Sequence, residues 1–296
     1  MPGGAYFTIL DAVDRITDIL VIVDPLHRDQ PSIAKAAALA RWLGAGIELL
    51  ICDTESTREK RLEERLRAHG NALLTDNLES LLEQLAEPLR DDGLDVTTHL
   101  INGDPLHEAV VSWMRNSPAD LVVKDTHHYS LGRRTFAIGT DRHFIRACPV
   151  PLLLTKPKVW GAPAVLVAAL DPGHVSDPSA ALEHRIADIT VSLALQVDAR
   201  ALAVHAYFPW GMPAVVAGEL RRSRIRQITD PYQIDDADVH VEAAMPTEYL
   251  PRMAAELHAD IVVMGAFARS AVKRAVIGST AERVLETLPC DILVVN

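Results

Sequence analysis

The sequence predicts an α/β fold built from two doubly wound parallel five-stranded sheets. Runs of apolar, β-branched residues, such as residues 19–23 and 261–264, have the length of buried strands. Helical segments separate these runs, and a strict alternation of strands and helices favours parallel sheets with helices on both faces. The chain of 296 residues is 49% hydrophobic, which suffices for two cores of ordinary size.

Five strands are predicted in the first half of the chain. They cover residues 19–23, 47–52, 94–101, 121–123 and 151–155. Helices are predicted over residues 32–43 and 140–147, after Gly103-Asp104-Pro105, and through the charged segment 54–92, as one long helix or two. The charges of that segment are typical of a solvated helix face.

The second half repeats this order of elements. Its strands cover residues 165–170, 201–207, 239–243, 261–264 and 292–295, and its helices begin near Pro178, after Gly211, at Thr247 and at Ser279. Pro157, Gly161 and Pro163 indicate a linker. The predicted organisation is an N-terminal extension (1–17), a first domain (18–156), a linker (157–163) and a second domain (164–296).

An internal sequence repeat relates the two halves. After a shift of about 140 positions, Ala119–Val123 aligns with Ala259–Val263, and near the front of each half Asp24-Pro25 matches Asp171-Pro172. A repeat of this length indicates a duplicated domain rather than a solenoid.

The segment from Gly265 to Ser279 predicts an anion-binding loop. It follows the strand at 261–264 and ends where a helix begins, because Ser279 can cap that helix and Glu282 can bond back to the amide of the cap. Gly265 and Gly278 would let the backbone approach a phosphate closely. The free amides and the dipole of the new helix favour an anion at this place.

This loop resembles the motif of nucleotide-binding members of the universal stress protein family. The motif is glycine, two residues, glycine, nine residues, then glycine and Ser or Thr. Gly265, Ala268 and Gly278-Ser279 keep that spacing, with alanine at the middle position. The first half adds further matching residues, at Lys124, His127-His128, Thr140–His143, Arg146 and Cys148-Pro149. Over residues 18–296 the chain is similar to the E-type members, which fuse two such domains.

The resemblance implies a Rossmann-like, adenine nucleotide alpha hydrolase-like domain in each half, with strand order 3-2-1-4-5. It implies that the final strands of the halves pair and make an internal pseudo-dimer, and a homodimer of the whole chain is compatible with it. It further implies ATP or another adenine nucleotide, accompanied by Mg²⁺, in the second half. The nucleotide-binding residues that it implies are Asp171, Met264, Gly265, Ala268, Arg269, Gly278, Ser279 and Thr280.

Two of these positions leave alternatives open. At position 268, alanine would cost about 1 kcal/mol if a positive φ angle is required. Its methyl group would in addition crowd the phosphate, and the affinity could fall without loss of the site. Arg269 either adds positive charge to the loop or is an ordinary solvated residue.

The first half has lost the loop. The motif positions are occupied by Asp125, His128, Ile138 and Gly139. Asp125 would place a carboxylate where phosphates approach, and Ile138 removes the close backbone path. We expect no nucleotide in this half, which is structural or binds something else.

Histidines of the first half raise the question of a transition-metal site. His127, His128 and His143, with Asp125 and Asp141, have suitable ligand atoms. However, His127 and His128 are adjacent and cannot easily both face one ion. We therefore expect satisfied histidines and no functional metal.

No catalytic signature accompanies the loop. The sequence contains neither a GxxxxGK[ST] phosphate loop nor a GxSxG nucleophile elbow. The prediction is a non-catalytic stress-response regulator that binds an adenine nucleotide. The alternatives are a scaffold or a protein that binds an apolar small ligand between the halves, and, with less support, a slow nucleotide hydrolase.

The net charge indicates which partners are excluded, and the cysteines indicate the cellular compartment. The net charge of -11 argues against binding to nucleic acid or to an anionic membrane. The three cysteines are far apart and lack zinc-finger spacing, which is typical of a reducing compartment. The first residues lack the basic and apolar regions of a signal peptide. We expect a cytoplasmic protein.

Overall fold

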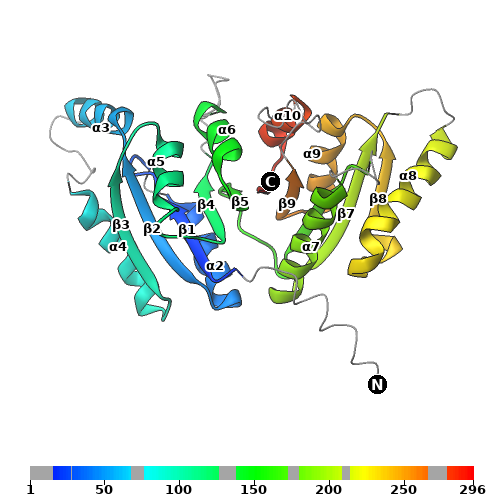
Figure 1. Cartoon of the computed structure of the whole chain (residues 1–296), viewed down its shortest axis with the longest axis horizontal. Helices are drawn as coiled ribbons and strands as arrows, with labels where there is room; N and C mark the ends of the chain where they lie inside the picture. Colours follow the sequence, from blue (N-terminus) through cyan, green and yellow to red (C-terminus); the bar gives the residue numbers. More distant parts are fainter. Residues whose placement is uncertain are drawn as a thin grey trace. The chain divides into compact units, whose positions relative to one another are not determined.

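The computed structural model describes residues 16–27, 29–67, 77–126, 138–172, 180–208, 214–265 and 279–296. The chain divides into two compact units, and the boundary lies between Pro157 and Lys158. Within each unit, parallel strands carry helices on both faces of the sheet (Figure 1). Each unit is therefore a doubly wound α/β domain, as predicted.

In the first unit, five parallel strands lie in the order β3-β2-β1-β4-β5. The elements are β1 (Asp18–Ile22), α2 (Pro31–Leu43), β2 (Gly46–Asp53), α3 (Glu55–Arg67), α4 (Leu78–Asp91), β3 (Val96–Asn102), α5 (Leu106–Trp113), β4 (Leu121–Asp125), α6 (Ile138–Ala147) and β5 (Leu152–Thr155).

In the second unit, the order is β10-β9-β6-β7-β8, and all four strand pairs are parallel. The elements are β6 (Val165–Ala169), α7 (Ala180–Gln196), β7 (Arg200–Tyr207), α8 (Ala214–Thr229), β8 (Val239–Ala243), α9 (Pro246–Glu256), β9 (Ile261–Gly265), α10 (Ser279–Thr287) and β10 (Asp291–Val295), with short 3-10 turns at Asp230–Tyr232 and Asp236–Asp238. Both units thus have the order 3-2-1-4-5, which confirms the order implied by the resemblance. The internal pseudo-dimer stays a prediction.

The central strands form the core of each unit. Leu20 and Val21 of β1, and Val122 and Val123 of β4, are completely buried. Their apolar runs are continuous rather than alternating, because helices cover both faces of a parallel sheet. In the described parts of the charged segment 54–92 there are two helices, α3 and α4. The side chain of Asn77 caps α4 by accepting a hydrogen bond from the Ser80 amide at 3.0 Å.

An aspartate fastens the amino end of the first strand in both units. Asp120 Oδ2 accepts hydrogen bonds from the backbone nitrogens of Thr17 at 2.8 Å and Asp18 at 3.1 Å. Asp260 Oδ2 accepts one from the Val165 nitrogen at 3.0 Å. These residues align in the internal repeat, so this part of the repeat has a structural reason.

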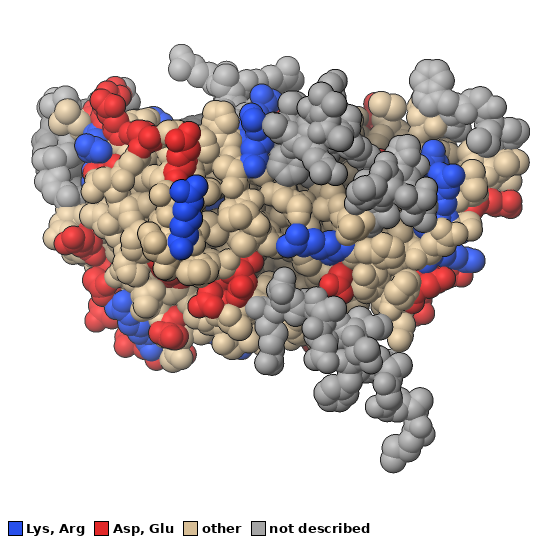
Figure 2. All heavy atoms as spheres, viewed as in Figure 1, with Lys and Arg blue, Asp and Glu red and all other residues tan. Residues whose placement is uncertain are grey.

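Charged side chains of both signs are interspersed over the visible face of the described residues (Figure 2). None of the helices described is long and apolar enough to cross a membrane.

Candidate functional site

A cavity of about 290 Å³ lies in the second unit at the carboxyl ends of β6, β7 and β9. The strand order reverses between β6 and β9, and ligands of open α/β sheets bind at this kind of switch point. Asp171, Met264, Gly265 and Thr280 line the cavity. These residues come from three separate stretches of the sequence, and all of them belong to the nucleotide-binding set predicted above.

The other predicted residues are less well defined. Ser279 is the first residue of α10, so a helix begins at the predicted residue, and the capping contacts of Ser279 and Glu282 stay a prediction. Ala268, Arg269 and Gly278 lie outside the residues that the structure describes. The structure therefore brings four of the predicted residues to one cavity, and their role in binding, like the loop itself, stays a prediction.

Most of the remaining lining is apolar. It comprises Ala169, Leu170, Leu182, Ile186, Val204, Ala206, Pro246, Leu250, Ala281 and Val284. Glu183 and His205 are the polar additions, with only 6% and 3% of their surface exposed. The motif could not reveal these two residues, since they come from α7 and β7 rather than from the loop. The internal repeat could have pointed to them, because the first half has apolar residues at the matching positions, Ala36 for Glu183 and Ile51 for His205.

Gly265 lets α7 lie close to the end of β9. A Cβ atom at this position would stand 2.9 Å from Leu182 Cδ2 and 3.7 Å from Ile186 Cδ1. Side chains of α7 thus occupy the space that a side chain at position 265 would need. A ligand that approaches the Gly265 backbone must share this space with the Leu182 side chain.

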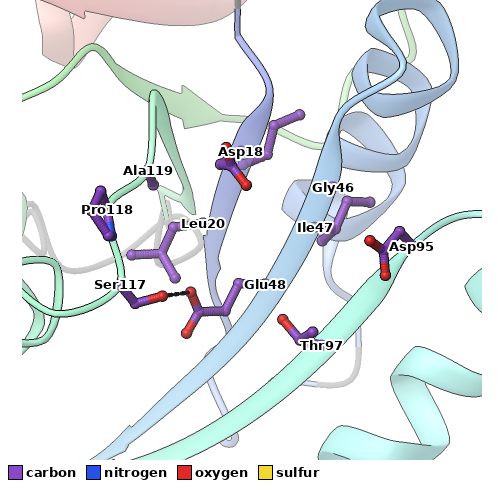
Figure 3. A pocket seen from close by; sticks show the side chains of 11 residues that line it. Asp18, Leu20, Gly46, Ile47, Glu48, Asp95, Thr97, Ser117, Pro118 and Ala119 are labelled. Carbon is purple, nitrogen blue, oxygen red and sulfur yellow. Dashed lines mark hydrogen bonds between the residues drawn. The ribbon is translucent and has the colours of Figure 1, made fainter.

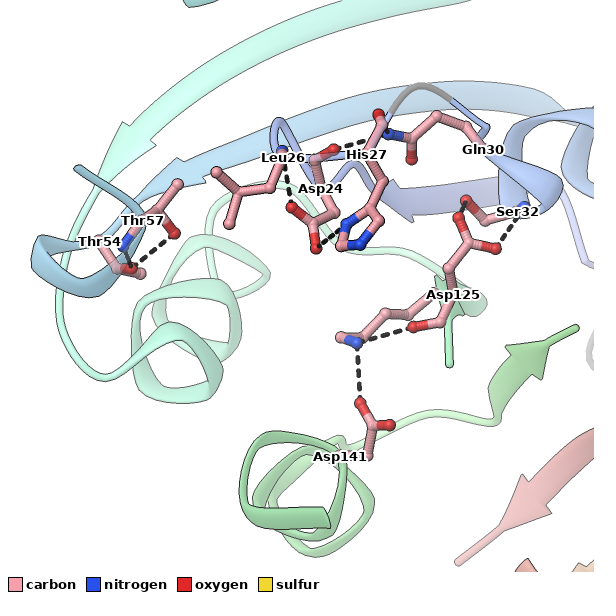
Figure 4. Close-up of polar contacts among 10 residues, drawn as sticks. Asp24, Leu26, His27, Gln30, Ser32, Thr54, Thr57, Asp125 and Asp141 are labelled. Carbon is pink, nitrogen blue, oxygen red and sulfur yellow. Dashed lines mark hydrogen bonds and ion pairs between the residues drawn. The ribbon is translucent and has the colours of Figure 1, made fainter. Parts of the chain in front are cut away.

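Asp125 takes the place of Gly265 in the first unit, and the residue is only 3% exposed. It accepts hydrogen bonds from the Ser32 backbone nitrogen at 2.8 Å, the Ser32 hydroxyl at 2.7 Å and the Thr155 hydroxyl at 2.6 Å. Figure 4 shows the carboxylate turned toward Ser32 at the start of α2. The sequence predicts this carboxylate in the path of phosphates, whereas in the structure it accepts hydrogen bonds from the first turn of α2.

The first unit nevertheless has its own cavity at the carboxyl ends of its strands, of about 330 Å³. Its lining is more polar and includes Asp24, Thr54, Thr57, Lys60, Asp104, His107, Lys124 and His143. Lys124 Nζ, which is mostly buried, pairs with Asp141 Oδ1 at 2.8 Å (Figure 4). The ring centroids of His107 and His143 are 4.8 Å apart. Burial, and then the neighbouring His143, lower the pKa of His107 from its ordinary value.

Among the described residues, no group of three or more His, Cys, Asp or Glu side chains is arranged to hold a metal ion. His143 lies against His107, and Asp141 is engaged by Lys124. His127 and His128 lie outside the described residues. Cys52 and Cys148 are buried, and burial raises the pKa of each thiol to about 11, so both are protonated at neutral pH.

A smaller cavity of about 140 Å³ lies at the opposite, amino ends of β1 and β2 (Figure 3). Glu48 on its wall accepts hydrogen bonds from Trp113 Nε1 at 2.6 Å and from the Ser117 hydroxyl at 2.8 Å. His99 Nδ1 lies 2.9 Å from the same carboxylate. These contacts tie β3 and the end of α5 to β2, which gives the carboxylate a structural role.

Comparison with known proteins matches each unit separately to one family. The model of the universal stress protein family matches residues 16–156 and again residues 165–296. The chain belongs to the universal stress protein family.

Relatives in the family match along nearly the whole chain. Universal stress protein E of Photorhabdus laumondii is 26% identical over 297 residues, covering 94% of both chains. Universal stress protein E of Escherichia coli K12 is 26% identical over 295 residues, covering 94% of this chain and 93% of that one. The E-type resemblance inferred from sequence is therefore confirmed at the level of similarity.

Solved structures of the family share the fold. A universal stress protein of Pseudomonas aeruginosa UCBPP-PA14 has a TM-score of 0.75 at 24% identity, covering 95% of this chain and 93% of that one. A universal stress protein of Archaeoglobus fulgidus has a TM-score of 0.64 at 14% identity, covering 94% and 95%.

Proposed function

We propose that this universal stress protein is a non-catalytic, cytoplasmic regulator that binds ATP or another adenine nucleotide in the cavity of its second unit. The observation that carries the proposal is the convergence of Asp171, Met264, Gly265 and Thr280 on one cavity at the switch point. The apolar wall suits the face of a purine ring. The start of α10 supplies amides and a positive dipole end for phosphate, with Mg²⁺ as the expected companion of the nucleotide.

Titration calorimetry with Mg-ATP tests this proposal directly. Wild type should bind ATP, and Gly278→Ile should abolish binding because its side chain would block the backbone path to the phosphates. Ile138→Ala, a change at the matching position of the first half, should leave binding unchanged. Ala268→Gly should bind about tenfold more tightly if the alanine costs near 1.4 kcal/mol. If neither wild type nor Ala268→Gly binds millimolar ATP, the proposal is wrong.

A small apolar ligand is the second candidate, and the lining of the same cavity favours it. Leu182, Ile186, Val204, Leu250 and Val284 present a predominantly aliphatic wall. Mass spectrometry of small molecules released when the purified protein is denatured separates the candidates. A released nucleotide supports the first proposal, and a released lipid-like or aromatic compound supports the second.

A further inference from the structure

Glu183 and His205 stand at core positions that are apolar in the first unit. Pro31, which begins α2, aligns with Pro178 ahead of α7, so Ala36 is the counterpart of Glu183. The pairs Asp18–Gly46 and Val165–Arg200 begin the equivalent strand ladders, so Ile51 is the counterpart of His205. Both apolar counterparts are fully buried. Replacing them by polar groups is costly unless each group is hydrogen-bonded, which makes their bonding informative.

Both side chains bind the same peptide group. The Asp171 backbone nitrogen donates to Glu183 Oε2 at 2.8 Å. His205 Nδ1 lies 2.9 Å from the Leu170 carbonyl oxygen and must be the donor, because a carbonyl oxygen only accepts. The C=O and N–H of a trans peptide point in opposite directions, so the two side chains hold the Leu170–Asp171 peptide from opposite sides.

Neighbouring rings fix the direction of the imidazole. The His205 ring stacks on the Tyr207 ring with centroids 5.9 Å apart and planes 12° from parallel. Arg221 of α8 lies 6.0 Å from the centroid of the Tyr207 ring, a cation–π distance. The hydrogen bond to Leu170 is therefore supported by contacts that reach α8.

We infer that Glu183 and His205 are positioning residues that act on the ligand through Asp171. Together they form a peptide clamp, which fixes the backbone from which the exposed Asp171 side chain projects at the rim of the cavity. This inference rests on the proposed function for the identity of the ligand. It adds two residues outside the nucleotide motif to the determinants of binding.

The first unit holds its equivalent aspartate in another way. Asp24 Oδ1 accepts from the Leu26 backbone nitrogen at 2.9 Å, and Asp24 Oδ2 lies 3.1 Å from His27 Nδ1 (Figure 4). There the carboxylate itself is engaged by its own loop. In the second unit, Glu183 and His205 hold the backbone of the Leu170–Asp171 peptide.

Hydrogen exchange tests the clamp without any ligand. In Glu183→Ala, which introduces the residue of the first unit, the Asp171 amide should exchange at least about tenfold faster because it loses its acceptor. The Leu170 amide, which donates to the Val204 carbonyl at 2.9 Å, should be unaffected. Glu219→Ala, at an exposed carboxylate of α8, is the matched control and should change neither amide. Unchanged exchange at Asp171 would overturn the clamp.

A double-mutant cycle with Mg-ATP tests its role in binding. Glu183→Ala and His205→Ile should each weaken binding about tenfold, and Glu183→Gln, which keeps an acceptor oxygen, should stay within about threefold of wild type. In an Asp171→Ala background the first two changes should have no further effect, because they act through that residue. Additive losses would overturn the positioning role. Absence of ATP binding by wild type would instead overturn the proposed function, and with it the ligand role of the clamp, whatever the exchange result.

Discussion

At the scale of single residues, the two units use one position in opposite ways. Asp125 fills the end of β4 with a carboxylate that satisfies three donors, whereas Gly265 leaves the end of β9 bare for Leu182. A buried carboxylate is tolerated only when donors surround it. The choice between aspartate and glycine at this position therefore decides whether the strand end binds the start of α2 or packs against Leu182 of α7.

Asp125→Ala should destabilise the protein by about 2–4 kcal/mol, because it leaves the Ser32 amide and two buried hydroxyl groups without their acceptor. Urea denaturation followed by circular dichroism measures the free energy of unfolding. Asp92→Ala, at an exposed carboxylate paired with Arg41, is the control and should cost less than about 1 kcal/mol. A cost for Asp125→Ala as small as that of the control would contradict this account.

His107 should make the first unit sensitive to acid. Because burial and His143 lower its folded pKa, the unfolded chain takes up a proton first as the pH falls below the ordinary histidine value of about 6.5. Stability should then decline until the folded pKa is passed. Glu108 opposes the shift and Arg146 reinforces it. His107→Asn should flatten the melting temperature between pH 7 and pH 5, and an unchanged pH profile would speak against this role.

At the scale of elements, close contact between α5 and the preceding strand depends on Gly103. A Cβ atom there would lie 2.6 Å from the Ala109 Cβ atom, which cannot move without the helix. The start of α5 contributes Leu106 and His107 to the cavity of the first unit. One small residue thus sets how near this helix lies to its sheet.

Gly103→Ala should therefore destabilise the first unit by about 1–3 kcal/mol through overpacking. Adding Ala109→Gly should restore part of the loss, although glycine inside a helix itself costs about 1 kcal/mol. Gly46→Ala is the control, because a Cβ atom at that position would meet nothing closer than 3.9 Å. Thermal unfolding of the variants measures these effects, and a double variant less stable than Gly103→Ala would refute the steric explanation.

The elements could be predicted from sequence because their signals are local. Buried strands such as β1 and β4 are continuous apolar runs, and the start of α10 carries its own capping pattern. Glu183 and His205 were missed because their burial depends on which face of α7 and which side of β7 meets the cavity. That information arises only when distant elements pack together. The repeat alignment recovers it afterwards, through Ala36 and Ile51.

At the scale of the whole molecule, the second unit begins earlier than its first strand. Lys158 Nζ pairs with Asp260 Oδ1 at 3.0 Å, and Trp160 Nε1 donates to Asp291 Oδ2 at 2.7 Å. Both aspartates are almost completely buried. Residues of the predicted linker are thus part of the folded unit, since they neutralise or satisfy carboxylates at the amino ends of β9 and β10.

A fragment of residues 158–296 should accordingly be more stable than one of residues 163–296. The shorter fragment loses partners of two buried carboxylates, at a cost of about 2–5 kcal/mol. Denaturation of both fragments measures the difference, and Trp160→Phe in the full chain isolates the contribution of the indole. Equal stability of the two fragments would show that the linker contacts contribute nothing.

The aspartates before the fourth strands also show which parts of the duplicated fold have stayed the same and which have changed. Asp120 and Asp260 accept the same backbone hydrogen bonds at the amino end of the first strand in both copies, so this end of the sheet is alike in the two units. At the carboxyl ends of the strands the copies differ. Gly265 stands where the first unit has Asp125, and the peptide clamp at Asp171 stands where the first unit has the side-chain turn of Asp24. After a gene duplication, one copy of this fold can therefore change the residues at the carboxyl ends of its strands while the contacts that align the strands at their amino ends stay the same.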